Sequence, residues 1–564
     1  MTAQRLRFGW LIAALVALMV VVAACGVDDE ALDEMSDDSA VAEATDDSDD
    51  ATTDDEEATD DEAEAPDDDQ DRDDDRYGGH LRVALPADIV GFDIRNRTDN
   101  PTLSVTELIF QPLVRLDTDL SFQPNLATDW DANDDASAYT FTLREGVEFH
   151  NGDPFTADDV VFTFESMLDP DFPSAEAGNF AGIDEVVVVD EFTVEFTLTS
   201  PDSEFIDKLS RMGIVPKDYV EEVGDDDFNV NPIGTGPFQY VEWVPESHIE
   251  IERFADYWDP ELPYLDRITY TPITEDSVRL ASFETGEIDL FQRNVPPEHQ
   301  SELEADERFV LDSKPFIYYH YLSLNLERVD EFEEPAVRQA IAYAIDRESI
   351  TEVIGYGSPG HQPLQPVSPF FNPDLEYYEY DPDRALEILD EAGIDPADVS
   401  FSLQTFTYPD YQRVGEMIHD QLTSLGFDVE LLVDEWTVVR EQCYLPITDC
   451  DAHNSATGGL GPDAALYARF HSEGGENKQY YSNERVDELL DEGRATVDED
   501  ERQAIYDEAI ELILEDSPVI FINDQDIPAL YWSYVKDFEI NSFYSYMQLD
   551  RTWIDQGEKE DLNP

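Results

Sequence analysis

The stretch that decides the fold reads YTFTLREGVEFHNGDPFTADDVVFTFE and runs from Tyr139 to Glu165. Over residues 139–144 apolar and polar side chains alternate, which is the period of a half-buried strand. The dipeptides Asn-Gly and Asp-Pro at 151–154 are turn formers. Thr156 is placed to cap a helix, with Asp159 at the third helical position of a capping box. The stretch therefore predicts a strand, a turn and a capped helix, and none of it carries catalytic chemistry.

The rest of the chain mixes strands and helices in the same way. Residues 186–198 predict a β-hairpin, and residues 335–350 predict one amphipathic helix. A further helix should begin at Asp381-Pro382 and end at Gly393. The order strand, helix, strand over residues 400–433 predicts a right-handed β-α-β unit. This mixture favours an α/β fold over an all-α or all-β fold.

The N-terminus has the features of a targeting segment. Two arginines precede the apolar run Leu11–Val22, which is too short to span a membrane comfortably. The run ends at Ala23-Ala24-Cys25, which resembles a bacterial lipobox. We therefore expect residues 1–24 to be a signal peptide and Cys25 to carry a lipid. An ordinary signal peptide followed by a chance cysteine is the alternative.

Residues 25–76 contain mostly Asp, Glu, Ala, Ser and Thr. Such a segment cannot bury enough apolar surface to offset the entropy of ordering it. We expect a disordered, self-repelling acidic tether between the lipid and the folded body.

The whole chain of 564 residues is strongly acidic, with 133 Asp and Glu against 32 Lys and Arg and a formal net charge of -101. Such a surface repels phosphates, so nucleic acid is excluded as a partner. Acidic residues spread over the folded part, with few lysines, favour a halophilic protein over a merely acidic one. In that case lowering the salt concentration should lower the melting temperature, because unscreened acids repel one another.

The cysteines and polar residues point away from catalysis and metal binding. Cys443 and Cys450 are close in sequence, and outside the membrane such a pair usually oxidises to a disulfide. Two cysteines are too few for a zinc site. The sequence has no Gly-x-Ser-x-Gly elbow, no His-Glu-x-x-His motif and no Walker loop, so we expect neither an enzyme nor a cofactor.

A series of short patterns runs in order along nearly the whole folded body and closely resembles the family 5 extracellular solute-binding proteins, the peptide- and nickel-type receptors of ABC importers. Besides the opening stretch they read NPIGTGPFQYVEW, DYW, YLDRI, GEIDL, YLSLN, VRQAIAYAIDRESI, YDPDRALEILDEAGI and YSNERVDELLDEGR.

The resemblance implies a two-lobed periplasmic-binding-protein fold of type II, in its large three-domain variety, with mixed sheets and a hinged cleft between the lobes. Lobe I should comprise residues 77–319, with a subdomain at about 116–214, and lobe II residues 320–518. Residues 519–564 should return to lobe I.

Such a protein works as a monomer at the extracellular face of the membrane or in the periplasm. It contacts the membrane only through its lipid, traps a peptide or other small solute and delivers it to an ABC permease and ATPase complex.

The residues that choose the ligand are less evident. Peptide-type members pair the ligand's amino terminus with an acid in a Trp-x-x-Asp pattern, whereas this chain has residues 454–463 there, without the Trp and with Asp463 displaced. Asp463 is as well explained as a helix N-cap. Two histidines, His320 and His453, fall near the expected cleft without forming a metal site. The candidate ligand contacts are Phe92, Tyr321, Asn325, Trp436, Asn454 and Asp463.

The leading hypothesis is thus a lipid-anchored peptide receptor. A receptor for an oligosaccharide, or for a nickel or haem chelate, is the alternative within the family. A secreted lipoprotein hydrolase and a structural cell-surface protein are the alternatives outside it.

Overall fold

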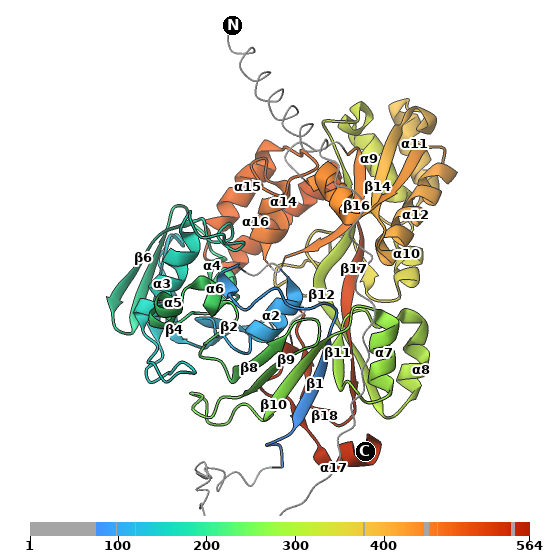
Figure 1. Cartoon of the computed structure of the whole chain (residues 1–564). Coiled ribbons are helices and arrows are strands. Elements are labelled where there is room, and N and C mark those ends of the chain that lie inside the picture. The colour runs from blue at the N-terminus through green and yellow to red at the C-terminus, as the bar shows by residue number, and fades with distance from the viewer. Residues whose placement is uncertain are drawn as a thin grey trace, which may run out of the picture. The chain divides into compact units, whose positions relative to one another are not determined.

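A computed structural model of the chain describes residues 75–96, 99–118, 120–375, 378–444, 450–459, 461–542 and 547–563 (Figure 1). The predicted signal peptide, Cys25 and nearly all of the tether lie outside these residues. Among the described residues, none of the helices has the length and apolarity needed to cross a membrane.

The opening stretch folds as predicted. Strand β5 (Ala138–Leu143) buries alternate side chains, and helix α3 (Ala157–Leu168) follows the turn. The capping box forms, with the Thr156 amide donating to Asp159 Oδ2 at 2.9 Å. This stretch belongs to a separate antiparallel sheet with the order β4 (Ala127–Ala132), β5, β7 (Thr193–Leu198) and β6 (Ile183–Asp190). The predicted hairpin is the pair β6 and β7.

The largest sheet has eleven strands and runs through the whole body. Its order is β15 (Asp428–Asp434), β14 (Ser400–Phe406), β16 (Ala452–Gly458), β12 (Phe309–Leu324), β17 (Val519–Trp532), β11 (Leu290–Gln292), β1 (His80–Leu85), β10 (Arg267–Pro272), β9 (His248–Arg253) and β8 (Phe238–Val244), with β13 (Ser358–Pro359) paired to β17.

Two long strands, β12 and β17, join the two lobes. Phe316 and Ile317 of β12 pack in the core that contains β1 and β8 to β11, whereas Leu322 and Leu324 pack with β14 and β16. Residues 519–522 of β17 pack in lobe II and residues 527–532 in lobe I. The pairing of β12 with β17 changes register between Pro315 and Tyr319, where the chain passes from one core to the other. The residue boundaries of the lobes stay a prediction.

Helices cover both faces of the sheet in lobe II (Figure 1). One face packs against α9 (Pro335–Ala344), α10 (Arg347–Ile354), α11 (Pro382–Ala392) and α12 (Pro409–Ser424); the other packs against α14 (Ala468–Phe470), α15 (Glu484–Arg494) and α16 (Glu499–Asp516). The remaining α-helices are α2 (Asn100–Thr106), α4 (Phe205–Leu209), α5 (Lys217–Val223), α6 (Asp225–Phe228), α7 (Asp276–Glu284), α8 (Gln300–Ala305), α13 (Trp436–Val439) and α17 (Gln556–Leu562).

Short segments complete the described structure. They are the strands β2 (Val114–Leu116), β3 (Phe122–Pro124), β18 (Val535–Lys536), β19 (Glu539–Ile540), β20 (Met547–Gln548) and β21 (Trp553–Ile554), the 3-10 turns η1 (Ile94–Asn96), η2 (Pro297–His299), η3 (Asp330–Glu333) and η4 (Pro396–Asp398), and the π-helical turns η5 (Arg440–Tyr444) and η6 (Asp463–Tyr467).

The helices and strands predicted from local sequence patterns in lobe II are confirmed, with one exception. Helix α11 begins at Pro382 and ends before Gly393, which adopts the left-handed conformation. Strands β14 and β15 are parallel and joined by α12, which is the predicted β-α-β unit. The single helix predicted over 335–350 was wrong. It breaks into α9 and α10 because Asp346 caps a new helix, accepting from the Ser349 amide at 3.0 Å.

Candidate functional site

The sheet topology places a candidate binding site where the two lobes face each other. In lobe II, β14 is parallel to both of its neighbours, β15 and β16, so the chain order reverses at β14. In lobe I, β1 is likewise parallel to both β10 and β11. Ligands of open α/β sheets bind outside the carboxyl ends of the strands at such switch points. The carboxyl end of β16 pairs with the start of the lobe II half of β12, so this edge of lobe II adjoins lobe I.

The carboxyl ends of β14 and β15 carry a group of aromatic side chains that we call the aromatic edge. Phe406 contacts both Tyr411 and Trp436, with ring centroids 4.9 and 5.1 Å apart, and Trp436 contacts Tyr444 at 5.3 Å. Tyr408 extends the group, 6.3 Å from Tyr411. Tyr408 is 52% exposed and Trp436 is 36% exposed. Exposed aromatic faces beside buried ones form a surface that an organic ligand can cover.

The aromatic edge is held from behind by polar contacts. The backbone carbonyl of Tyr411 accepts from the Asn454 side chain at 3.0 Å and from the Thr405 hydroxyl at 2.9 Å. The His320 ring lies 5.1 Å from the Tyr411 ring. His320 is buried, which lowers its pKa to about 4, so it packs as a neutral ring.

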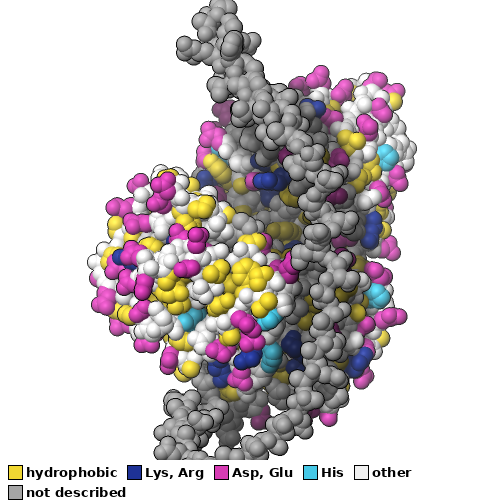
Figure 2. All heavy atoms as spheres, in the orientation of Figure 1, with side chains coloured by type: hydrophobic (Ala, Val, Ile, Leu, Met, Phe, Trp, Pro, Cys, Tyr) yellow, Lys and Arg dark blue, Asp and Glu magenta, His cyan; other side chains and the backbone are white. Residues whose placement is uncertain are grey.

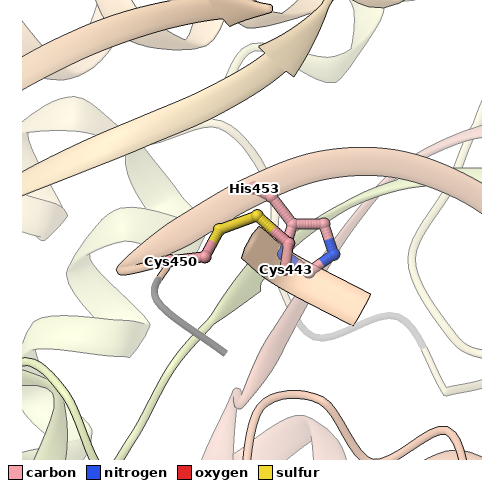
Figure 3. Close-up of side chains that lie close together, drawn as sticks. All are labelled: Cys443, Cys450 and His453. Atoms are coloured by element: carbon pink, nitrogen blue, oxygen red, sulfur yellow. A yellow bond between two sulfur atoms is a disulfide. The ribbon is translucent and has the colours of Figure 1, made fainter. Parts of the chain in front are cut away.

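A disulfide anchors the turn that carries Tyr444. Cys443 and Cys450 are bonded, with an S–S distance of 2.13 Å (Figure 3). Both pack in one cluster with Phe406. His453 lies beside them, so that one potential metal-ligand atom of each side chain falls within 4.8 Å of the others. Because both sulfurs are used in the disulfide, this trio does not offer the thiolates that a metal would require.

A small cavity lies behind the edge, in lobe II. Its volume is about 20 Å³, enough for about one water molecule. Burial lowers the pKa of His453 to about 4, and its Nε2 has no hydrogen-bond partner among the described residues. Arg469 donates to the Thr457 hydroxyl, whereas its Nε is likewise unpartnered within the described structure. The lining includes Tyr319, Tyr321, Tyr444, His453, Thr457 and Arg469.

Lobe I places the cation Arg293 near the aromatic edge. Arg293 follows β11 directly, and its guanidinium carbon lies 4.9 Å from the centroid of Phe316 and 5.8 Å from that of Tyr318. Burial lowers the pKa of Arg293, and the ionisable groups that act on it are the phenols of Tyr318 and Tyr411. Because an arginine stays protonated in proteins, this is a positive charge among aromatic rings.

A second meeting point of the lobes is built from charges, and we call it the charge cluster. Lobe I supplies Asp202 and Glu204, which precede α4, and Lys208, which lies within it. Glu204 accepts from Arg502 at 3.0 Å and from the Asp463 amide at 2.8 Å. Lys208 bonds Asp202 at 2.6 Å and Asp463 at 2.8 Å, and Arg494 lies 2.8 Å from Asp463. These pairs connect lobe I to η6, α15 and α16 of lobe II.

The structure places the six predicted ligand contacts in different surroundings. Trp436 belongs to the aromatic edge and Tyr321 to the cavity lining, with its hydroxyl 3.5 Å from that of Tyr444. Phe92 is fully buried in lobe I, in contact with Tyr240 and Trp243.

The other three make bonds within the protein. Asn454 is fully buried under Tyr411, and Asn325 donates to the Cys450 carbonyl at 3.1 Å. Asp463 lies in the charge cluster, paired with Lys208 and Arg494. A ligand contact by any of the six stays a prediction.

Sequence reasoning missed Tyr408, Tyr411, Arg293 and Arg469. The aromatics could have been found, because they directly follow the strand predicted over 400–405. Arg293 follows a strand of only three residues, and nothing in the sequence shows that its charge lacks a carboxylate partner.

Comparison with known proteins gives consistent results. A family model described as bacterial extracellular solute-binding proteins, family 5 Middle, matches residues 121–477. The glutathione-binding protein GsiB of Pectobacterium atrosepticum is 29% identical over 457 residues, covering 78% of this chain and 87% of GsiB.

Two solved structures are similar along most of the chain. The oligopeptide-binding protein AppA of Bacillus subtilis, in complex with a nonapeptide, has a TM-score of 0.71 at 26% identity, covering 85% of this chain and 99% of AppA. The ABC transporter-associated periplasmic binding protein DppA of Helicobacter pylori, in complex with the peptide STSA, has a TM-score of 0.73 at 27% identity, covering 86% of this chain and 99% of DppA.

Proposed function

This chain belongs to family 5 of the bacterial extracellular solute-binding proteins, and from that premise we propose that it is a lipid-anchored receptor that captures a peptide between its lobes and delivers it to an ABC importer. As a member of this family it is a solute-binding protein and not an enzyme. The observation that carries the proposal is the aromatic edge at the switch point of lobe II, facing lobe I.

The chemistry of the edge suits a peptide. Extended peptides combine apolar side chains with a polar backbone, and a partly exposed aromatic surface with few fixed charges can bind them. The relatives support this ligand class, because GsiB is named for glutathione and AppA and DppA were solved with peptides. Asp463 does not provide the acid for a ligand amine in our proposal, since Lys208 and Arg494 already neutralise it.

The proposed mechanism is closure of the two lobes about the shared strands. Only β12 and β17 pass from one core to the other, among the described strands of the large sheet. The register change at Pro315–Tyr319 leaves the pairing weakest at the crossing point, where a small rotation costs few hydrogen bonds. Closing brings the aromatic edge onto lobe I and covers the ligand.

The experiment that tests the ligand class is mass spectrometry of small molecules that copurify with the full chain, followed by calorimetric titration of the ligand found. We expect a peptide of a few residues that binds with a dissociation constant of micromolar or lower, about -8 kcal/mol. A sugar or a metal chelate in its place would overturn the peptide proposal and leave the receptor role. Turnover of the bound compound would overturn the receptor role itself.

The anchor is tested separately. Cys25→Ala removes the atom to which a lipid would be attached, so the variant should appear in the culture medium while the parent protein stays with the membrane fraction. Membrane-bound Cys25→Ala would contradict the lipid anchor.

A further inference from the structure

Arg293 is an unusual cation in a chain with a formal net charge of -101. Within the described structure, no carboxylate lies within ion-pair distance of its guanidinium and no hydrogen-bond acceptor is bonded to it. Two buried arginines of the chain show the contrast: Arg95 pairs with Asp93 at 2.7 Å, and Arg347 donates to four backbone carbonyls. The chain has 133 acidic side chains, and yet none of the described ones pairs with Arg293. The positive charge of Arg293 is therefore available to a ligand.

The backbone holds this charge in place. Arg293 and Asn294 have φ angles of +66° and +49°, a left-handed conformation that side chains other than glycine rarely adopt. The Arg293 amide donates to the Pro528 carbonyl at 2.7 Å, and the Val295 carbonyl accepts from the Tyr356 hydroxyl at 3.1 Å. A tight turn fixed on both sides therefore positions the guanidinium at the carboxyl end of β11.

The surroundings of Arg293 come from both lobes. Tyr318 lies on the strand that joins the lobes, and Tyr411 belongs to the aromatic edge of lobe II. Two aromatic rings, 4.9 and 5.8 Å away, contact the guanidinium without neutralising its charge, and the side chain is half-buried. An ion pair formed in such a place is screened less than one on the open surface.

We propose that Arg293 binds the C-terminal carboxylate of the ligand, so that this protein selects peptides whose C-terminus is free. This inference rests on the proposed function, because it names the ligand class of the same interlobe site. The guanidinium can accommodate a carboxylate through two parallel hydrogen bonds, which a lysine or an amide cannot reproduce. The aromatic edge then covers the apolar part of the same ligand.

The electrostatic field of the whole protein and the local charge of Arg293 should have opposite effects on the preference for a carboxylate. A net charge of -101 favours a neutral ligand over a negatively charged one, other things being equal. A preference for a free carboxylate over its amide must therefore come from a local cation. Amidation of the ligand thus separates the effect of Arg293 from the general repulsion.

The test is calorimetric titration of the full chain, stripped of copurified ligand, with two peptides and their C-terminal amides: tetra-alanine and glutathione. We expect the parent protein to bind the free acids about 10- to 100-fold more tightly than the amides, the range for a charge-assisted hydrogen bond. Arg293→Gln should remove that difference by weakening the acids alone, and Arg293→Lys should restore part of it.

Arg308→Gln is the matched control, because it also removes one positive charge from lobe I but breaks a surface pair with Asp306. This control should keep the preference for the acid, and the melting temperatures of all variants should agree. Equal affinity of the parent for acid and amide, or a preference that survives in Arg293→Gln, overturns the proposal for Arg293. A preference that disappears in Arg469→Gln but persists in Arg293→Gln overturns it in favour of the cavity behind the edge. If neither free acid binds, the peptide function itself fails.

Discussion

The two lobes meet in two regions of opposite chemistry. In the charge cluster Asp463 and Glu204 contact cations from this chain, across distances of 2.8 to 3.0 Å. Beside the aromatic edge the rings of Phe316 and Tyr318 lie 4.9 and 5.8 Å from the Arg293 guanidinium, and no carboxylate of the described residues reaches that cation. The first region can hold the lobes together by itself, whereas the second is complete only when a ligand supplies the missing charge. Stability and binding should therefore respond to different substitutions.

The largest expected effect is the loss of stability when the charge cluster is broken. Arg502→Met leaves Glu204 buried without its cation, which typically costs about 3 kcal/mol or more of folding free energy. The measurement is the melting transition by calorimetry at about pH 9, above the pKa of about 8 that Glu204 has in the parent protein.

Arg485→Met is the control, because its pairs with Glu488 and Glu508 are exposed and exposed pairs contribute about 0 to 1 kcal/mol. Equal effects of the two substitutions would mean that the buried pair contributes no more to folding stability than the exposed pairs do.

A smaller effect on folding stability should depend on the pH. Burial and the neighbouring Asp463 raise the pKa of Glu204 from its usual value of 4.5 to about 8. The folded chain then keeps a proton that the unfolded chain releases, so this stabilisation is complete below about pH 4.5 and is lost as the pH rises through about 8.

The difference in unfolding free energy between the parent and Glu204→Gln should accordingly change in favour of Glu204→Gln between pH 5 and pH 9, by roughly 1 to 3 kcal/mol. Parallel profiles for the two proteins would contradict the raised pKa.

The smallest expected effect is a loss of ligand affinity, and it tests the aromatic edge. Trp436→Ala removes an exposed ring from the aromatic edge, and ligand affinity should fall by about 1 to 2 kcal/mol while the melting temperature of the free protein changes little.

Tyr380→Ala is the control, since Tyr380 is 50% exposed and lies outside the edge. If Trp436→Ala lowers stability but leaves the affinity intact, then the edge is part of the scaffold and not of the binding surface.

The acidic surface sets the background for these comparisons. Figure 2 shows Asp and Glu side chains spread over the visible face of the described residues, with few Lys and Arg among them. Halophily stays a prediction, and the melting temperature as a function of salt concentration is its test.

The fold was largely predictable because its signals are local. The alternation in β5 and the capping box of α3 depend on residues a few positions apart, and the β-α-β unit of lobe II follows from three consecutive patterns. The one wrong element, the helix over 335–350, failed at Asp346, whose side chain both permits a helix and caps a new one.

The site was predictable only in part. Trp436 was found because it follows the strand predicted to end at residue 433. Asp463 was proposed as a ligand contact, whereas its partners Lys208 and Arg494 come from positions 255 and 31 residues away. No sequence pattern pairs residues at such distances, so the expectation could not include them.

The sequence by itself determined the family and the order of the elements, because both depend on motifs and periodicities read along the chain. It also indicated the absence of catalytic motifs. Only the tertiary structure decided which charged side chains have an oppositely charged partner and which do not. An ion pair or an unpaired arginine is a property of three-dimensional distance, and the electrostatic energy of Asp463 and Arg293 depends on neighbours that folding brings from the other lobe.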